Sequence, residues 1–259
     1  MLIILSPAKT LDYDTPLVSD TYTLPERRQQ SAILVDALRE LSAPQLAKLM
    51  SISQDLATLN QERFKHWGGR FTQKNSRPAI FAFKGDVYRG LDVSSFSEAD
   101  LEFAQEHLRI LSGLHGVLRP LDRMQPYRLE MGTAINVGEH KDLYGFWGDS
   151  LARALDKQLD SLGKKQLVNL ASKEYFKAVD TAALRAQVIT PQFKEWRRGA
   201  FRIVSFSAKR ARGLMAAWAI KKRVQHARQL KKFNLEGYGF NEELSSELEW
   251  VFTRDVPQK

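Results

Sequence analysis

Polar and ionisable side chains in this sequence gather where short apolar runs end or where glycines stand. Lys9 lies in Ser6–Thr10, directly after the apolar run Leu2–Leu5. A loop that leaves a buried strand is a common ligand site, and a lysine there can meet a phosphate. Seven other residues beside expected strand ends and glycines are candidates for a polar cleft: Lys84, Asp86, Tyr127, Arg128, Glu130, Asp149 and Lys177. These groups could supply acid–base catalysis and phosphate clamping; the alternative is a set of surface, ion-paired or core-flanking residues.

The stretch Leu108–Asp122 predicts phosphate binding by the backbone. An amphipathic helix is expected to end at Ser112, and Gly113, Leu114, His115 and Gly116 to form a tight turn before a second short helix, with Arg119 beside it. This pattern resembles a helix-hairpin-helix over about residues 100–126, with one residue more than the usual Gly-apolar-Gly turn. In such a motif the glycines let backbone N–H groups approach a DNA phosphate. The alternative is a corner packed in the core.

The positive charge of the chain is concentrated in one segment. The whole sequence has 39 Lys and Arg, 30 Asp and Glu and a net charge of +9, whereas the basic segment 194–232 alone holds 13 Lys or Arg and a single acid, Glu195. Lys209, Arg210 and Arg212 gather at the start of the helix expected there. Such a segment indicates a phosphate-contacting face, with a solvated or membrane-surface helix face as the alternatives.

Several common chemistries have no support in the sequence. It contains no cysteine, which excludes disulfides, iron–sulfur ligation and thiol nucleophiles. The five histidines show no metal-ligand spacing, so we expect no metal site. Walker A, Rossmann and nucleophile-elbow motifs are missing, so no cofactor is expected. No membrane span or secretion signal is visible, which favours a cytoplasmic protein.

The elements expected to position these residues alternate in mixed order. Strands are expected at 2–5, 79–83, 168–171, 200–206 and 250–252, and helices at 25–40, after Ser42, after Ser97 and over 209–229. Ser97 with Asp100, and Ser42 with Gln45, have the spacing of a capping box. We therefore expect a mixed α/β (α+β) fold, a single domain over 1–259 built around a mixed sheet.

The assembled segments resemble the YaaA family of bacterial peroxide-stress proteins. The resemblance extends almost from end to end of the chain, over Ser6–Thr10, Phe83–Leu91, Leu108–Gly132, Leu143–Asp149, Asn169–Val179, Ala211–Ile220 and Phe233–Phe240. It implies a cytoplasmic α/β protein that helps cells survive hydrogen peroxide and is associated with low free iron. It also implies a helix-hairpin-helix and a basic cleft for duplex or branched DNA. On this sequence the hairpin would be Gly113–Gly116 with Arg119, and the cleft Lys9, Lys209, Arg210 and Arg212.

Three functions are compatible with these observations. The first is a stress protein, expected to be monomeric, that binds DNA without sequence readout through its phosphates. The second is an enzyme acting on a nucleotide or other phosphorylated substrate in the polar cleft. The third is a non-catalytic protein that binds a partner through a dry apolar patch in place of the basic cleft.

Overall fold

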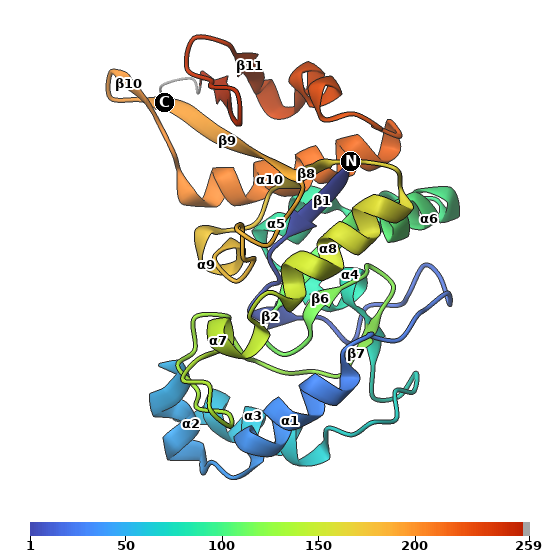
Figure 1. Ribbon diagram of the computed structural model, residues 1–259, viewed down its shortest axis with the longest axis vertical. Coiled ribbons are helices and arrows are strands. Elements are labelled where there is room, and N and C mark those ends of the chain that lie inside the picture. The colour runs from blue at the N-terminus through green and yellow to red at the C-terminus, as the bar shows by residue number, and fades with distance from the viewer. Residues whose placement is uncertain (256–259) are drawn as a thin grey trace.

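A mixed β-sheet forms the centre of the molecule, as a computed structural model that describes residues 1–255 shows (Figure 1). Its strand order is β11 (Gly239–Asn241), β12 (Glu249–Arg254), β9 (Gln187–Arg197), β8 (Gln166–Asn169), β1 (Leu2–Leu5), β5 (Leu108–Ser112) and β6 (Gly116–Leu118), and β10 (Ala200–Arg202) pairs with β9. The pairs of β1 with β5 and with β8, and of β9 with β8 and with β12, are parallel, and the other pairs are antiparallel. The mixed α/β fold expected from the sequence is therefore confirmed.

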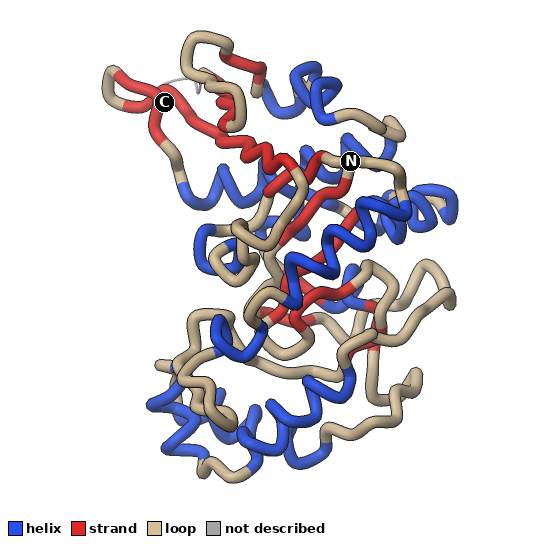
Figure 2. The backbone as a smooth tube through the Cα atoms, viewed as in Figure 1, coloured by secondary structure: helices blue, strands red, loops and turns tan. Residues whose placement is uncertain are grey.

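The central strand β1 is buried along its whole length, which its continuous apolar run predicts. Helices cover both faces of the sheet (Figures 1 and 2). Helix α8 (Ser150–Ser161) lies against one face. Helices α6 (Glu98–His107) and α10 (Ser205–Lys221) pack together on the other. Four shorter helices and turns of the second half of the chain are α7 (Leu143–Trp147), α9 (Lys173–Phe176), η2 (Ala227–Lys232) and η3 (Leu235–Gly237).

A second group of elements lies beyond the carboxyl ends of the central strands. It contains the helices α1 (Arg28–Arg39), α2 (Ala43–Met50) and α3 (Gln54–His66), which pack on one another (Figure 2). Two small antiparallel pairs connect this group to the sheet: β2 (Thr10–Leu11) with β4 (Phe83–Lys84), and β3 (Arg77–Pro78) with β7 (Arg123–Met124).

A local signal located the start of α6 correctly. Asp100 donates its backbone N–H to the Ser97 hydroxyl at 3.2 Å, and Ser97 returns its own N–H to the Asp100 carboxylate at 3.0 Å. This is the capping box that the sequence predicts at the start of α6. The predicted helix over 209–229 is instead α10, which begins at Ser205 and ends at Lys221. The strand predicted over 200–206 is β10 only as far as Arg202, because Ser205 and Phe206 belong to α10.

Two predicted elements are wrong. Residues 79–83, expected as a strand, form the short helix α4 (Ala79–Ala82) followed by β4, because a short buried apolar run is compatible with either structure. The helix expected to reach Ser112 ends at His107, and residues 108–112 become β5, since pairing with β1 and β6 overrides the helical spacing.

The contact between α10 and α5 (Asp86–Leu91) depends on glycine. A Cβ atom at Gly213 would lie 1.8 Å from the backbone oxygen of Val87, and one at Gly90 would lie 2.1 Å from that of Arg210. The two backbones therefore touch directly. Helix α5 stands in the chain between the loop after β4 and the turn η1 (Val93–Ser95). Its contact with α10 therefore holds both segments next to α10.

Candidate functional site

The loops that follow β1, β5 and β8 meet at the edge of the sheet that the carboxyl ends of these strands form. Ser6 follows β1 and Ser172 follows β8, and the Ser172 N–H donates to the Ser6 hydroxyl at 2.8 Å. Ser112 ends β5, and its hydroxyl lies 2.6 Å from the Tyr127 hydroxyl. Helix α6 leads to β5 over one face and α8 leads to β8 over the other, so chain connections diverge on either side of β1. Such a switch point is where open α/β sheets usually bind ligands.

Four of the sequence-predicted residues meet in a small crevice at this edge: Lys9, Tyr127, Arg128 and Glu130. The Glu130 carboxylate accepts from Lys9 at 2.7 Å and from Arg128 at 3.0 Å. The space inside the crevice is about 20 Å³, enough for about one water molecule. The crevice therefore holds an ion-paired cluster and has no room for a nucleotide in this conformation.

The tyrosines around this edge are buried, neutral phenols that take part in hydrogen bonds. Tyr88 donates to the Ser6 carbonyl at 3.0 Å. Burial raises the pKa values of Tyr88, Tyr127 and Tyr175 above the ordinary value for a phenol. These groups are therefore poor general bases at neutral pH.

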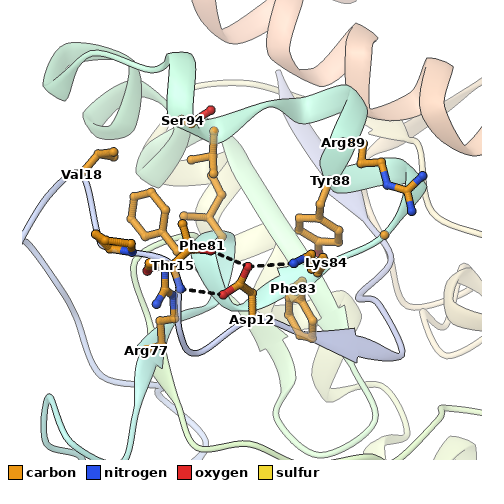
Figure 3. A pocket seen from close by; sticks show the side chains of 14 residues that line it. Asp12, Thr15, Val18, Arg77, Phe81, Phe83, Lys84, Tyr88, Arg89 and Ser94 are labelled. Carbon is orange, nitrogen blue, oxygen red and sulfur yellow. Dashed lines mark hydrogen bonds and ion pairs between the residues drawn. The ribbon is translucent and has the colours of Figure 1, made fainter.

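Lys84 pairs with Asp12 (Figure 3), and Asp86 pairs with Arg89 instead of Lys84. Lys84 reaches the Asp12 carboxylate at 3.2 Å, while Asp86 lies 3.5 Å from Arg89. Hydrogen bonds, first from the Thr15 backbone and then from the side chains of Thr15 and Lys84, hold the pKa of Asp12 well below its usual range despite its desolvation. Asp12 and Lys84 line a hollow of about 180 Å³ with several apolar side chains, among them Phe81 and Phe83.

The other two polar-cleft candidates lie apart from the crevice. Asp149 pairs with Arg153, one turn along α8. The Lys177 ammonium lies 4.6 Å from the centre of the Tyr144 ring. The predicted polar cleft is thus divided among several places, and whether any of its residues acts on a ligand stays a prediction.

The helix-hairpin-helix prediction is wrong, because Gly113–Gly116 connects two buried strands, β5 and β6. A Cβ at Gly113 would lie 2.4 Å from the Leu129 carbonyl oxygen, and the Gly113 carbonyl accepts from the Trp147 indole at 3.0 Å. Leu114, His115 and Gly116 are buried as well. The turn is packed on all sides, so these four residues offer no surface to a DNA phosphate.

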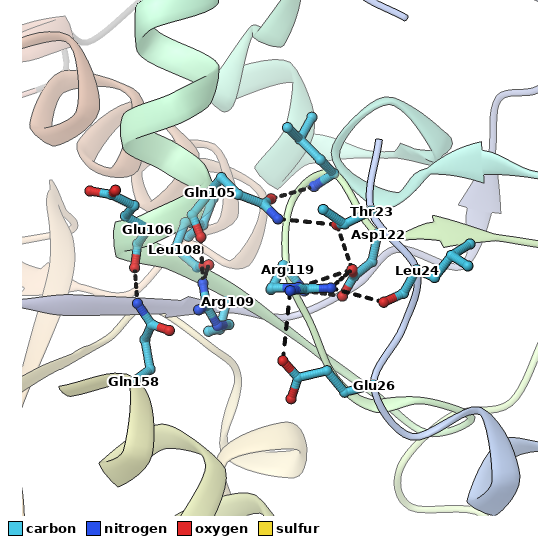
Figure 4. A network of polar contacts seen from close by, with 11 residues as sticks. Thr23, Leu24, Glu26, Gln105, Glu106, Leu108, Arg109, Arg119, Asp122 and Gln158 are labelled. Carbon is cyan, nitrogen blue, oxygen red and sulfur yellow. Dashed lines mark hydrogen bonds and ion pairs between the residues drawn. The ribbon is translucent and has the colours of Figure 1, made fainter. Parts of the chain in front are cut away.

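His115 is held as a neutral imidazole inside that turn. Its Nδ1 lies 2.9 Å from the Ser31 hydroxyl, and its backbone N–H donates to Ser112 at 2.9 Å. Burial lowers the pKa of His115 to about 3. Arg119, the cation expected beside the turn, binds Asp122 at 2.8 Å and the Leu24 carbonyl at 2.8 Å (Figure 4).

The basic segment 194–232 begins on a β-hairpin that extends from the sheet, made of the end of β9 and β10 (Figures 1 and 2). Arg198 and Gly199 form its two-residue turn, with φ of 52° and 79°. Trp196 and Phe201 pair across the strands with ring centroids 5.0 Å apart. Positive φ at both turn positions and an aromatic cross-strand pair are typical of a well-defined hairpin.

Cations on this hairpin and at the start of α10 differ in their charge partners. Arg197 pairs with Glu195, and Arg210 pairs with Glu236. Four cations form no ion pair with any residue in the described range 1–255: Lys194, Arg198, Arg202 and Lys209; the last three are exposed. Arg212 also has no ion pair there and is half-buried, and its burial lowers its pKa. Sequence reasoning singled out Lys209, Arg210 and Arg212 but not the hairpin, although Arg198-Gly199 within an alternating pattern was a turn signal.

Comparison with known proteins identifies the family of this chain. A family model described as peroxide stress protein YaaA matches residues 1–244. The chain belongs to this family. It is 55% identical over 254 residues to a UPF0246 protein of Ralstonia nicotianae, with 98% of this chain and 99% of the relative covered. A UPF0246 protein of Aliivibrio fischeri is 50% identical over 259 residues, with both chains covered in full.

Membership of the YaaA family supports a role in peroxide stress. Among residues 1–255, no three His, Asp or Glu side chains gather closely enough to hold a metal ion. In the same range no helix combines the length and apolar character needed to cross a bilayer.

Proposed function

We propose that this member of the YaaA family serves peroxide stress by binding duplex or branched DNA through phosphate contacts, without sequence readout. The observation that carries the proposal is the set of cations on the protruding β9–β10 hairpin and the start of α10 that form no ion pair with residues 1–255. A two-stranded ribbon of this kind fits the major groove of B-DNA. Exposed cations neutralise phosphates and release bound counterions, which supplies affinity independent of sequence.

The hairpin also exposes apolar side chains beside these cations. Trp196 is 42% exposed, and Phe206 and Ile203, on the connection to α10, are each 57% exposed. Aromatic faces beside cations stack on bases that are open at a branch point or a distorted step. This combination favours DNA as the partner over a wholly apolar protein surface.

The base of the hairpin is held rigidly, which suits an element that contacts a polyanion. Glu195 is 1% exposed and accepts from Arg197 at 2.9 Å and from Arg254 of β12 at 2.5 Å. Desolvation raises the pKa of this carboxylate, but hydrogen bonds from Ser207, Arg254 and Arg197 outweigh it and lower the pKa. Arg198, at the tip, has the left-handed backbone that a two-residue hairpin turn requires, and its side chain is exposed.

Binding to a duplex and to a four-way junction, measured by fluorescence anisotropy between 50 and 200 mM salt, tests the proposal. We expect a steep fall in affinity with salt in the wild type. Replacement of Lys194, Arg198 and Arg202 by Gln is expected to reduce the slope by about 0.9 for each phosphate that is no longer neutralised. The matched control replaces Lys48, Arg70 and Lys74, which are exposed and lie outside the hairpin, by Gln.

Unchanged binding by the hairpin variant would mean that the phosphates are bound elsewhere. The next candidates are then Lys209 and Arg212, and replacing both by Gln tests them. A flat salt response in the wild type contradicts phosphate binding altogether. Lys9, Arg119 and Arg210 already face carboxylates, so we expect smaller effects from their replacement.

A further inference from the structure

A groove of about 480 Å³ lies on the opposite side of β1 from the β9–β10 hairpin, close to the edge strand β6. It is enclosed by α8, the residues just before α1, and the loop between β6 and β7. Five cationic side chains and two acidic ones line it: Arg27, Arg109, Arg119, Arg153 and Lys157, with Glu26 and Asp122. This volume is in the range of pockets that hold small molecules, about 300–1,000 Å³.

The inner wall of the groove carries a buried arginine that has no acidic partner of its own (Figure 4). Arg109, on β5, is 6% exposed. Its Nη1 donates to the carbonyls of Gln105 at 2.8 Å and Leu108 at 2.7 Å. Within residues 1–255 its Nε and Nη2 donate no hydrogen bond and it forms no ion pair. Burial, and then the nearby charge of Arg119, lower the pKa of Arg109 to about 10.

Both acids of the groove form ion pairs with Arg119. Asp122 is 1% exposed and accepts from Arg119 Nε at 3.0 Å and Nη2 at 2.8 Å, and from the Thr23 hydroxyl at 2.6 Å. Glu26 lies 3.7 Å from Arg119 Nη1. Both carboxylates pair with Arg119 and act on Arg109 only at longer range, so Arg109 forms no ion pair among residues 1–255. A largely buried guanidinium with donors left over is stabilised when a ligand supplies an anionic acceptor.

The rim of the groove adds cations at the spacing of one helical turn. Arg153 and Lys157 lie four residues apart on α8 and both line the groove. Arg27 also lines it, and it is tied to the start of α8 by a hydrogen bond from Nη2 to the Ser150 carbonyl at 3.2 Å. The arrangement thus has a recessed guanidinium inside and two exposed cations, Arg153 and Lys157, at the entrance, of which Arg153 also pairs with Asp149.

We propose that this groove binds a small molecule carrying a phosphomonoester or diphosphate group, with Arg109 contacting the phosphate and Arg153 and Lys157 holding it from the rim. Guanidinium groups bind phosphate oxygens through paired, charge-assisted hydrogen bonds. A recessed guanidinium is more accessible to a compact anion than to the backbone of a duplex. The site is independent of the proposed DNA surface, which different elements carry.

Titration calorimetry with inorganic pyrophosphate, at constant ionic strength set by NaCl, tests this site in the full chain. We expect saturable binding to the wild type. The exposed double variant Arg153→Gln/Lys157→Gln should weaken it at least tenfold, and Arg109→Gln should abolish it. Because the loss of a buried arginine can perturb folding, the rim variant carries the test if Arg109→Gln does not fold. The matched control is Lys48→Gln/Lys74→Gln, with the same change in charge, which should bind as the wild type does.

Three results would overturn the proposal: no heat beyond that of the NaCl reference, equal affinity in the rim variant and wild type, or an equal loss when Arg198 and Arg202 of the hairpin are replaced by Gln. The last result would mean that pyrophosphate follows general positive charge or the DNA surface. Loss of DNA binding in the hairpin variant with intact pyrophosphate binding would support both sites separately.

Discussion

At the scale of single residues, charge partners decide which cations remain available to a ligand. Lys9, Lys84 and Arg210 belong to segments that the sequence marks as functional, yet each faces a carboxylate at 2.7–3.2 Å. Exposed pairs of this kind contribute little to stability, but they reduce the charge that a phosphate experiences. Arg198 and Arg109 form no ion pair in the described range, and they carry the two proposals.

His115 gives a prediction about pH and stability. Its pKa is about 3 in the folded protein and close to 6.5 in an unfolded chain, so below pH 6.5 the unfolded state binds a proton that the native state does not. Stability should therefore fall as the pH drops from 6.5 towards 3. His115→Gln is expected to remove about 1.5 kcal/mol of the loss between pH 6.5 and 5, measured by urea unfolding.

The control for this measurement is His66→Gln, because the His66 side chain is 81% exposed. It should leave the pH dependence unchanged. An identical fall in stability for wild type and His115→Gln would show that the buried imidazole is not the titrating group.

At the scale of elements, the most demanding contact is that between α5 and α10. The helices approach so closely that Gly213 has no room for a methyl group, and its helical backbone cannot shift without moving Val87. Gly213→Ala is expected to lower the free energy of unfolding by about 3 kcal/mol, the upper part of the range for overpacking. Chemical denaturation followed by circular dichroism measures this change.

Gly69→Ala serves as the comparison, since a Cβ there meets no atom within 4 Å. Its effect should stay within about 0.5 kcal/mol. A Gly213→Ala protein as stable as Gly69→Ala would contradict the direct backbone contact.

Local signals and pairing explain which elements were predictable. The capping box at Ser97 acts within one turn, so the sequence was sufficient to locate it. The boundary at His107 was not predictable, because Leu108–Ser112 has apolar residues that suit a helix face or a strand equally well. Its parallel pairing with β1, more than a hundred residues earlier in the chain, decided the outcome.

At the scale of the whole molecule, the DNA binding that we propose would connect the localised charge to peroxide protection. Fe²⁺ transfers one electron to H₂O₂, which becomes hydroxide ion and a hydroxyl radical while iron becomes Fe³⁺. Iron condensed on DNA as a counterion forms that radical beside the sugar backbone. A protein that neutralises phosphates releases counterions, so the radical forms farther from the strand.

Nicking of a supercoiled plasmid by Fe²⁺ and H₂O₂ tests this route. At protein concentrations that saturate the DNA, we expect several-fold fewer nicks with the wild type. The hairpin variant lacking Lys194, Arg198 and Arg202 should protect much less at the same concentration. Equal protection by the two proteins would indicate general scavenging of radicals and contradict the counterion mechanism.

The sequence by itself determined the mixed α/β class, the buried first strand, the helix start at Ser97 and the concentration of charge in 194–232, because each depends on composition or on neighbours along the chain. Tertiary structure alone decided that Gly113–Gly116 is a buried strand turn, that Lys9 meets Glu130, and that Arg109 lies in a cationic groove without an ion pair to the described residues. These outcomes depend on strand pairing and on charges brought together from distant segments. Burial then sets which of those charges a ligand can reach.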